Sequence, residues 1–442
     1  MLRHIGTILL LVAAGAVWGQ VLPDPFPEKS VSIATLPNGM RVVVREDHSL
    51  PIVAINVVVR GGSGAEEDAR GLAHYVEHMV FQGTKNYPKP LEPQYVMEQV
   101  GAISNATTSY DLTRFEAAAS SEQTDLMVRV LADITLNPLL TDEAFKHERP
   151  LILAEIAQDT DNPQATVTNE VNRLSYKHYP YRDLVTGALE DVLALKTTDV
   201  RAFHDRWYVP NNMSIVLVGD ISLKSATELA TKYFGDAKPA ELPNPPEIEI
   251  AGPGEAKTAE FPSTMPDTYL GLAFAAPPSS NFNAMVATDL LVTMLADGHD
   301  ALLPQWWAKD GLRVTNFGGE FTSTHAPGRI IFWMQCAPNT VDKIRESTLA
   351  LLDQVGLGNL PPAALRLAQQ RLAAQYLRSN ETYTAQSSTL SYYEGLGGAQ
   401  WACRYIQQLQ ECNIDRLRVA VPIYHIAQVT VGKTITDKEV GL

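Results

Sequence analysis

Residues 61–88 have the sequence GGSGAEEDARGLAHYVEHMVFQGTKNYP and include the string HYVEH at positions 74–78. The apolar residues around this string recur at helical spacing, which predicts a helix. Positions i and i+4 of a helix share one face, so His74 and His78 can direct ring nitrogens to one metal ion. Glu77 can place a carboxylate beside that ion, where it would accept a proton from bound water. Taken alone, the string also fits two surface histidines and a solvated glutamate that coincide on an amphipathic helix.

A catalytic zinc ion needs a third protein ligand and an open fourth position for water. The predicted helix at 143–158, EAFKHERPLILAEIAQ, carries Glu148 and Glu155 on roughly one face, about two turns apart. One carboxylate could bind the metal while the other orients a histidine from behind. Two ordinary exposed glutamates would show the same spacing, so the residues leave both interpretations open. Pro150 lies between them, and we expect a bend there because proline removes one backbone hydrogen bond.

Several elements beyond the metal string resemble the pitrilysin family of inverzincins, which includes insulin-degrading enzyme, the mitochondrial processing peptidase and many short bacterial zinc proteases. In this family H-x-x-E-H is followed by F-x-G-T, which residues 81–84 match as FQGT. An E-R-x-x-x-x-x-E string occurs further along, and residues 148–155 match it. Residues 103–116, ISNATTSYDLTRFE, resemble the family's N-A-x-T…T-x-Y strand, with Phe115 in place of the usual tyrosine.

The resemblance implies a zinc metallopeptidase with one Zn²⁺ bound by His74, His78 and Glu155. It implies that Glu77 is the general base of peptide hydrolysis. It also implies that Glu148 is a supporting carboxylate that orients the site without being a metal ligand itself.

The same resemblance implies a strand that borders the substrate, because Asn105 and Ala106 match the family's N-A pair. Such a strand would hold a peptide in an extended conformation by main-chain pairing, which gives little side-chain selectivity. The expected substrates are therefore peptides or unfolded polypeptides.

Around these motifs, strand-like and helical segments alternate without the regular cadence of a doubly wound parallel sheet, which favours an α+β fold. An Asn38-Gly39 turn predicts a hairpin between the first two strands. The predicted strands are 31–36, 40–46, 54–60, 112–120 and 213–221. The predicted helices are 71–83, 93–100, 123–136, 143–158 and 199–208.

The second part of the chain repeats this order. Residues 269–277 (YLGLAFAAP) and 287–298 (ATDLLVTMLADG) follow each other as the strand and helix around the metal string do, and residues 414–434 echo 199–221. We therefore expect two homologous α/β-sandwich halves, each an antiparallel-rich sheet packed with helices, that form a clamp-shaped half-chamber. The expected divisions are a signal peptide at 1–19, a zinc-bearing peptidase domain at 20–240, a Pro- and Gly-rich linker at 241–256 and a second domain without a metal motif at 257–442.

The second half departs from the family pattern. Asp289, Val292 and Thr293 occupy the positions where a metal string would fall. In active family members, a segment of the form R-E-K-x-G-L-A-Y supplies an arginine and a tyrosine that hold the substrate and polarise the scissile carbonyl.

The matching segment in this chain is WWAKDGLRVTNF at 306–317, aligned on its Gly-Leu pair. Trp307 then falls at the arginine position and Val314 at the tyrosine position, and neither can donate as the family residues do. Arg313 lies close by, and a misalignment of one or two residues would also account for the difference. Trp306 and Trp307 could form a platform for substrate or could be core aromatic residues.

Because the arginine and tyrosine donors are missing, the resemblance to two-chain family members implies the zinc-bearing subunit of a heterodimer with a homologous Arg/Tyr-bearing subunit. A self-sufficient enzyme is the alternative. Two rivals from other classes are a noncatalytic zinc-binding clamp or scaffold subunit of a peptidase-like complex, and an unrelated zinc hydrolase such as an amidase.

Composition limits the remaining possibilities. The chain has 442 residues with 45% hydrophobic and 19% charged residues, and its net charge of −15 opposes nonspecific binding to nucleic acid. Residues 1–19 combine a basic start, a short apolar run and small residues near the end, which predicts a cleaved export signal and a periplasmic location. An uncleaved anchor is the alternative. No later stretch reaches the roughly 20 apolar residues of a transmembrane helix, so we expect no stable membrane span. Cys403 and Cys412 could pair in that compartment, but three cysteines leave one over.

Overall fold

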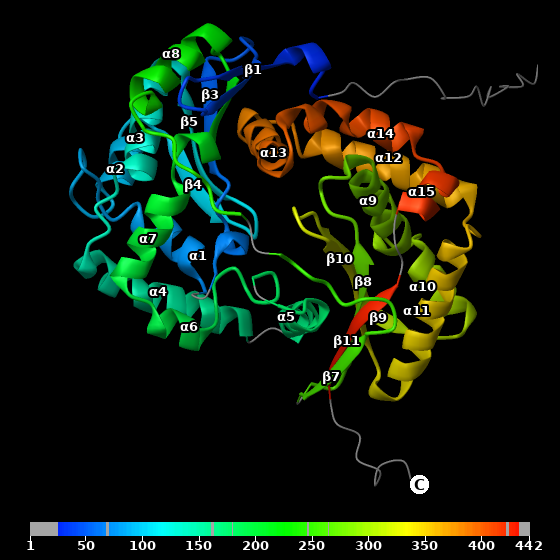
Figure 1. The fold of residues 1–442 in the computed structure, drawn as a ribbon. Coiled ribbons are helices and arrows are strands. Elements are labelled where there is room, and N and C mark those ends of the chain that lie inside the picture. The colour runs from blue at the N-terminus through cyan, green and yellow to red at the C-terminus, as the bar shows by residue number, and fades with distance from the viewer. Residues whose placement is uncertain are drawn as a thin grey trace, which may run out of the picture.

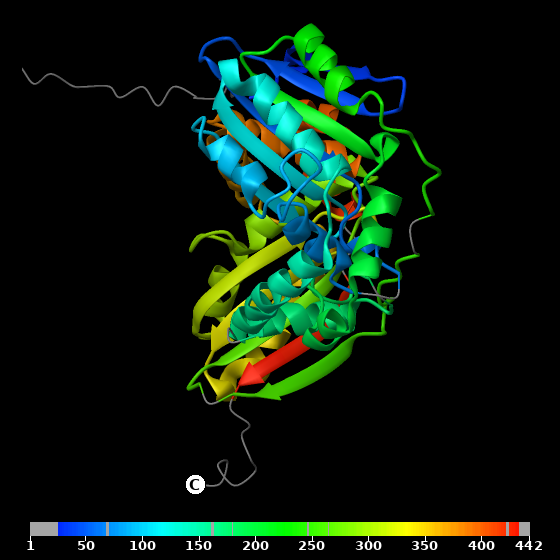
Figure 2. The ribbon, with the colours of Figure 1, turned by 90° about the vertical axis from the view of Figure 1, so that its left-hand side faces the viewer.

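Figure 1 shows a computed structural model of the chain, and we describe residues 25–67, 70–160, 163–178, 180–244, 247–263, 265–420 and 424–432. The chain forms two mixed α+β units, each built on one sheet with helices packed on it, and Figure 2 shows the two sheets from the side. The predicted fold class, an α+β fold of two sheet-and-helix halves, is confirmed. The predicted signal peptide at 1–19 lies outside the described residues.

The first sheet has six strands in the order β1-β2-β6-β3-β5-β4. The strands are β1 (Val31–Thr35), β2 (Arg41–Glu46), β3 (Ile52–Val59), β4 (Ile103–Thr108), β5 (Thr113–Ser120) and β6 (Met213–Gly219). β1 and β2 form the predicted hairpin, and β2 and β6 are the parallel pair of this sheet. β4 lies at the edge and, among the described residues, pairs with β5 alone, so none of their strands occupies its other side.

Eight α-helices accompany the first sheet among the described residues, and they include all five that periodicity predicts. They are α1 (Leu72–Met79), α2 (Glu92–Glu98), α3 (Thr124–Leu136), α4 (Asp142–Thr160), α5 (Pro163–Ser175), α6 (Leu189–Ala194), α7 (Thr197–Trp207) and α8 (Leu223–Phe234). Apart from α5, their apolar faces and the alternate residues of the strands form one buried core. Short 3₁₀ turns cover Glu28–Ser30, Ser63–Ala65, Ser121–Gln123, Pro210–Asn212, Pro338–Thr340 and Ala399–Arg404.

The second sheet has five strands in the order β7-β11-β8-β10-β9. The strands are β7 (Lys257–Pro262), β8 (Thr268–Ala276), β9 (Val314–Thr322), β10 (Gly328–Cys336) and β11 (His425–Gly432). The helices are α9 (Phe282–Ala296), α10 (Leu302–Lys309), α11 (Val341–Gly356), α12 (Pro362–Arg378), α13 (Tyr383–Leu396), α14 (Tyr405–Glu411) and α15 (Ile414–Ala420). This order repeats β2-β6-β3-β5-β4, and β7–β11 repeats the parallel pair β2–β6. The sheet topology therefore supports the duplication that the sequence predicts.

The two halves exchange one helix each. α5 belongs to the first half in sequence but packs on β8, β10 and β11, where Val167 and Val171 join the second sheet's apolar face. Gly271 permits this approach, because a Cβ there would lie 2.3 Å from a Val167 methyl carbon. α13 in turn packs on β3 and β6 of the first sheet. Sequence order and packing thus divide the chain differently at these two helices.

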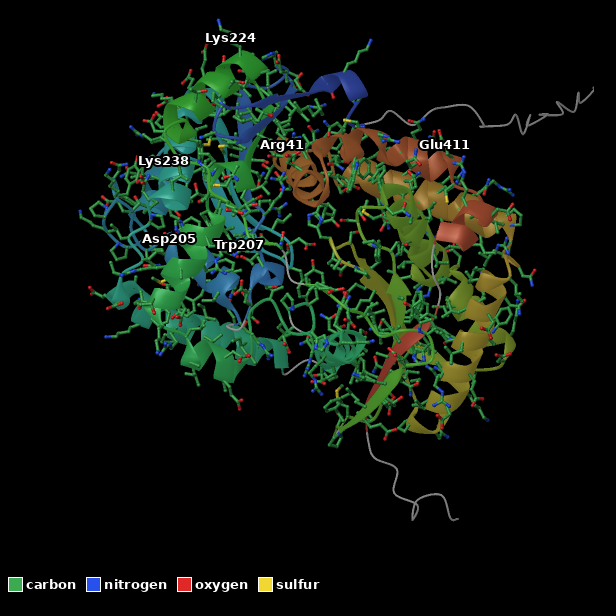
Figure 3. All side chains as sticks on the ribbon, in the orientation of Figure 1. Arg41, Asp205, Trp207, Lys224, Lys238 and Glu411 are labelled. Atoms are coloured by element: carbon green, nitrogen blue, oxygen red, sulfur yellow. The ribbon has the colours of Figure 1, made fainter. Side chains whose placement is uncertain are left out.

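A buried ion cluster fixes α13 on the first sheet. Glu394 is 1% exposed and accepts hydrogen bonds from Arg41 on β2, Arg60 after β3 and Ser214 on β6. Figure 3 shows Arg41 between the first sheet and α13. The two guanidinium groups hold the pKa of Glu394 below its ordinary value, although burial opposes them.

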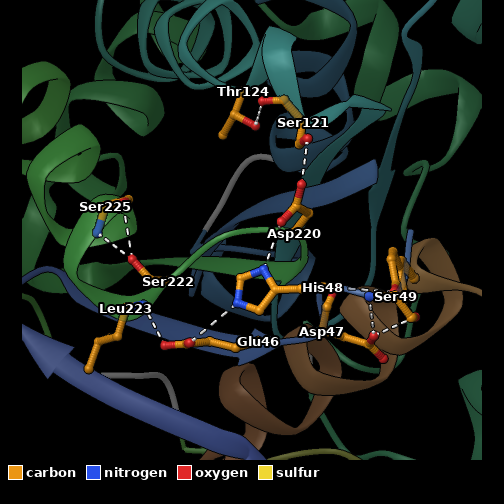
Figure 4. A network of polar contacts seen from close by, with 11 residues as sticks. Glu46, Asp47, His48, Ser49, Ser121, Thr124, Asp220, Ser222, Leu223 and Ser225 are labelled. Atoms are coloured by element: carbon orange, nitrogen blue, oxygen red, sulfur yellow. Dashed lines mark hydrogen bonds and ion pairs between the residues drawn. The ribbon is translucent and has the colours of Figure 1, made fainter. Parts of the chain in front are cut away.

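At its other end α13 meets the loops that follow β2 and β6 (Figure 4). His48 lies 2.7 Å from an oxygen of Asp220, whose other oxygen accepts a hydrogen bond from Ser121. The Tyr383 hydroxyl on α13 is 2.8 Å from Ser49 Oγ and donates to the Asp47 carbonyl. α13 is therefore attached to the first half at both of its ends.

Two further sequence expectations concern the membrane and the cysteines. In the part of the chain that the structure describes, no helix is both long and apolar enough to cross a membrane. Cys403 and Cys412 are buried and are not joined by a disulfide in that same part of the chain.

Candidate metal centre

The metal string lies on α1, whose two faces differ in chemistry. One face is buried in the first core and consists of apolar residues and Tyr75, whose hydroxyl donates to the Phe145 carbonyl on α4. The carboxylate of Glu66 accepts hydrogen bonds from the backbone N–H groups of Gly71 and Ala73. Two N–H groups at the start of α1 that lack partners within the helix thereby have an acceptor. The other face of the helix is left to the polar residues of the string.

His74, His78 and Glu155 come together as the sequence predicts. The Nε2 atoms of His74 and His78 lie 3.4 and 3.6 Å from the same oxygen, Oε2 of Glu155. One possible ligand atom from each residue lies within 4.8 Å of the others, and the residues are only partly buried. Two histidines and one glutamate are the ligand set of several catalytic zinc sites, so the donor chemistry fits this ion.

Glu148 lies behind His78. Its Oε2 is 3.1 Å from His78 Nδ1, and its Oε1 is 3.1 Å from His147 Nδ1. Burial raises the pKa of Glu148, but the hydrogen bonds with the two histidines outweigh burial and lower it overall. This contact fits the supporting role expected of Glu148, because a carboxylate on Nδ1 would leave Nε2 free for a metal ion.

The helix that carries both glutamates is continuous. α4 runs from Asp142 to Thr160 with Pro150 inside it, so the helix is not interrupted where we expect a bend. The helix therefore continues past Pro150 to Glu155 and beyond. Both carboxylates thereby reach α1 from one helix.

The ionisation of His74 suits metal binding. Burial, followed by the proximity of His78, lowers the pKa of His74 to about 4. The ring is therefore neutral near pH 7, the form that can bind a metal ion. His74 Nδ1 is buried and has no hydrogen-bond partner among the described residues, whereas Nε2 points to Glu155.

Glu77 lies on the same face of α1, and its Oε2 accepts a 2.5 Å hydrogen bond from Thr108 Oγ1 at the end of β4. Burial raises the pKa of Glu77 from 4.5, while the Thr108 hydroxyl and His78 oppose the rise. A carboxylate with a raised pKa accepts protons more readily than an exposed one, as a general base must.

The predicted substrate strand is the edge strand β4. Asn105 and Ala106 are opposite Glu116 and Phe115 of β5, and no strand pairs with their other side in the described residues. Phe115 is fully buried and packs against Phe81. The edge therefore offers main-chain groups for an added strand, next to the helix that carries Glu77.

The FQGT element, residues 81–84, lies in the loop that follows α1. Gly83 has φ = +113°, and a Cβ there would lie 2.8 Å from the Pro88 carbonyl oxygen. Thr84 Oγ1 donates to Asp133, which is buried in α3 and also accepts from the Asn86 backbone N–H. The element thus joins the end of α1 to α3.

Three residues near the site were not singled out by the sequence analysis. Asp133 carried a usable signal, because it is a charged residue inside the apolar pattern of residues 123–136. Glu66 and Thr108 carried none, because their roles depend on how a loop and a strand end lie against α1.

The second half shows no corresponding metal group within the described ranges. Asp289 on α9 instead accepts a hydrogen bond from the Tyr405 hydroxyl, and burial raises its pKa to about 7. Trp307 is a core residue, 1% exposed, and its Nε1–H donates to Thr348 Oγ1. Arg313 is exposed and Val314 begins β9.

Comparisons with known proteins agree with this division. The model described as Insulinase (Peptidase family M16) matches residues 41–188, and the one described as Peptidase M16 inactive domain matches residues 194–372. Zinc protease PqqE of Helicobacter pylori is 24% identical over 430 residues, which cover 96% of each chain. Mitochondrial-processing peptidase subunit beta of Caenorhabditis elegans is 30% identical over 220 residues, 50% of this chain and 48% of the relative.

Cytochrome b-c1 complex subunit 1 of Bos taurus is 32% identical over 221 residues, 50% of this chain and 45% of that protein. Among solved structures, a protease from Helicobacter pylori has a TM-score of 0.82 at 23% identity, covering 91% of this chain and 99% of that one. A peptidase M16 inactive domain from Pseudomonas fluorescens has a TM-score of 0.80 at 18% identity, covering 92% and 99%. These two structures share the fold.

Proposed function

Because the chain belongs to the insulinase family of peptidases, peptidase family M16, we propose that it is a zinc metalloendopeptidase that cleaves peptides or unfolded polypeptides. The observation that carries the proposal is the convergence of His74, His78 and Glu155 within 4.8 Å, next to a base and an open strand edge. The test is Glu77→Gln, which should lower kcat by at least about 10³-fold and leave the zinc content unchanged. Retained cleavage would refute the assignment.

We propose one Zn²⁺ per chain, held by His74 Nε2, His78 Nε2 and a Glu155 carboxylate oxygen. Bound there, zinc would supply Lewis acidity, which makes water a stronger acid and a better nucleophile near pH 7. Glu77 accepts the proton that the attacking water loses and returns it to the leaving amine nitrogen. Glu148 keeps the His78 ring in place and fixes its tautomer.

The substrate should lie along β4. An extended peptide can pair with the open edge near Asn105 and Ala106, which brings a scissile bond beside α1. Main-chain pairing depends on an extended conformation more than on particular side chains. This supports peptides and unfolded polypeptides as the substrate class.

We propose that the working enzyme is a heterodimer with a homologous subunit that supplies the arginine and tyrosine donors. The burial of Trp307 and the aliphatic Val314 support this, since neither residue can bind a carbonyl oxygen as a donor. Two relatives are named as subunits of larger assemblies, which also supports it. Robust zinc-dependent cleavage by the purified chain alone would contradict this part of the proposal.

A periplasmic location is proposed from the first 19 residues. Their basic start and apolar run are typical of a cleaved export signal. Fractionation of cells that produce the full chain should recover it, shortened near residue 19, in the periplasmic fraction. Full-length chain in the membrane fraction would instead indicate an uncleaved anchor.

A noncatalytic zinc-binding clamp or scaffold subunit is the alternative function. The match of residues 194–372 to a domain described as inactive favours it. Against it, the ligand set and Glu77 are all present in the first half. The Glu77→Gln comparison separates the two functions, because a scaffold would show no zinc-dependent cleavage that the substitution could remove.

A further inference from the structure

We infer that Thr108 is a positioning residue for Glu77, so that the strand proposed to hold the substrate also fixes the general base. The inference rests on the proposed peptidase function. Thr108 is the last residue of β4, and its hydroxyl donates to Glu77 Oε2 on α1. The hydroxyl thus holds one of the two carboxylate oxygens of Glu77 in place.

The hydroxyl of Thr108 is itself held in place from the sheet. Thr108 is directly opposite Thr113 in the β4–β5 register, and their Oγ1 atoms are 3.2 Å apart. Thr113 is fully buried, and its one hydroxyl proton can go either to the Gly61 carbonyl or to Thr108 Oγ1. Thr108 Oγ1 can accept that proton while its own proton goes to Glu77. The chain of contacts from Gly61 to Glu77 thus begins in the first core and ends at the base.

A fixed carboxylate matters because Glu77 has three rotatable side-chain bonds and partly faces solvent. Catalysis by a general base requires the carboxylate within hydrogen-bond reach of the proton it removes. Displacements of about 1 Å in such groups can cost about 100-fold in rate. The proposed substrate pairing and the contact with Glu77 both involve β4. A peptide paired with that strand would therefore lie at a fixed position relative to Glu77.

The Thr108 side chain lies on the other face of β4 from the exposed Asn105, and the proposed substrate pairing uses main-chain groups. Side chains alternate along a strand, and on β4 those of Ile103, Asn105 and Thr107 are exposed, whereas Thr108 is partly buried. Thr108 therefore acts on the reaction through Glu77. Its loss should lower kcat and leave KM nearly unchanged.

The first test needs no activity. Thr108→Val, Glu77→Leu and the double variant are compared by chemical denaturation of the metal-free full chain. If the hydroxyl binds the carboxylate, Thr108→Val should lower the denaturation midpoint clearly less in the Glu77→Leu background than in the wild type. Additive midpoint shifts would overturn the inference.

The second test measures zinc content and the cleavage of a fluorescently labelled unfolded polypeptide by the zinc-loaded enzyme in its active assembly. Thr108→Val should lower kcat about 10-fold with KM within about 2-fold and zinc content unchanged, and Thr108→Ser should restore kcat to within about 3-fold. An unchanged kcat in Thr108→Val, or no recovery with serine, would overturn the inference.

Thr227→Val is the matched control. Thr227 lies on α8, and its hydroxyl donates to the Leu223 carbonyl, so the same chemical change removes one hydrogen bond away from the site. It should leave kcat unchanged. If the wild type shows no zinc-dependent cleavage at all, the proposed function fails, while the denaturation cycle still decides whether Thr108 holds Glu77.

Discussion

The two halves of the chain share one sheet order but differ in the helix that follows the corresponding strand. In the first half, α1 buries one face and presents the metal string at 74–78 on the other. In the second half, α9 is buried almost all round, and Asp289, Val292 and Thr293 occupy the matching positions. A helix that is apolar on all sides is a core element. The repeat therefore preserves packing, while the proposed chemistry depends on a few polar positions in one half.

The largest effect should come from making the first half resemble the second. Glu155→Gln removes the charge of the proposed third ligand but keeps its shape. Zinc content should fall from about one per chain to below about 0.1, and cleavage should be lost, because a neutral amide is a much weaker zinc ligand. Metal analysis of the purified chain checks this.

Glu143→Gln is the matched control for that experiment. Glu143 is an exposed glutamate on the same helix, in the first turn of α4. Its substitution should leave zinc content and activity unchanged. Full zinc content in Glu155→Gln would show that the metal is held elsewhere.

The converse change places an arginine donor in the second half. It should destabilise the protein because the position is buried. Trp307→Arg places a charge where the side chain is 1% exposed and packs against Phe317 at a ring distance of 5.6 Å. The free energy of unfolding should fall by about 3–5 kcal/mol, measured by chemical denaturation.

Trp306→Arg is the control, because Trp306 is only partly buried and lies under Lys309. It should cost less than about 1 kcal/mol. If Trp307→Arg folds normally and makes the lone chain active, the second half retains a working donor position, and the heterodimer is not needed.

The same contrast shows what sequence can predict. Helical and strand periodicity located the elements around the site, because each buries one apolar face that the pattern reveals. Helix geometry predicted that His74 and His78 share one face, although the string alone also fitted two surface histidines. Spacing could not distinguish Glu155 from an ordinary exposed glutamate, and only the family resemblance predicted it as a ligand. In the structure Glu155 lies beside both histidines.

Long-range packing was beyond the sequence. α5 is not among the predicted helices, and its local sequence does not indicate that it packs on the second sheet. Thr108 is similar, because its contact with Glu77 depends on the end of β4 meeting α1. The interpretation of Trp307 as a core residue, one of two alternatives, is confirmed.

A smaller effect should appear in the pH dependence of stability. Burial raises the pKa of Asp289 to about 7, far above its ordinary value of 3.8. The folded state therefore binds this proton more tightly than the unfolded state, so its stabilising contribution is complete below about pH 4 and is lost as the pH rises through 7. Asp289→Asn should raise the free energy of unfolding by about 1–2 kcal/mol at pH 8 and leave it nearly unchanged at pH 4.

Denaturation curves at pH 4, 6 and 8 check this prediction. Asp353→Asn, at an exposed position on α11, is the control and should show no such trend. A gain that is the same at all three pH values would mean that Asp289 does not titrate in this range.

The smallest effect is expected at Arg313, and it bears most directly on the difference between the halves. Arg313 is the one alternative arginine donor in the aligned segment, but it is exposed between α10 and β9, and no ion pair holds it in the described part of the chain. An unanchored surface side chain cannot hold a carbonyl oxygen in a fixed position. Arg313→Ala should therefore change kcat/KM of the active assembly by less than about 2-fold and the free energy of unfolding by less than about 0.5 kcal/mol. A loss of 10-fold or more in kcat/KM would mean that this half still supplies its own arginine, and the argument for a partner would then rest on the missing tyrosine alone.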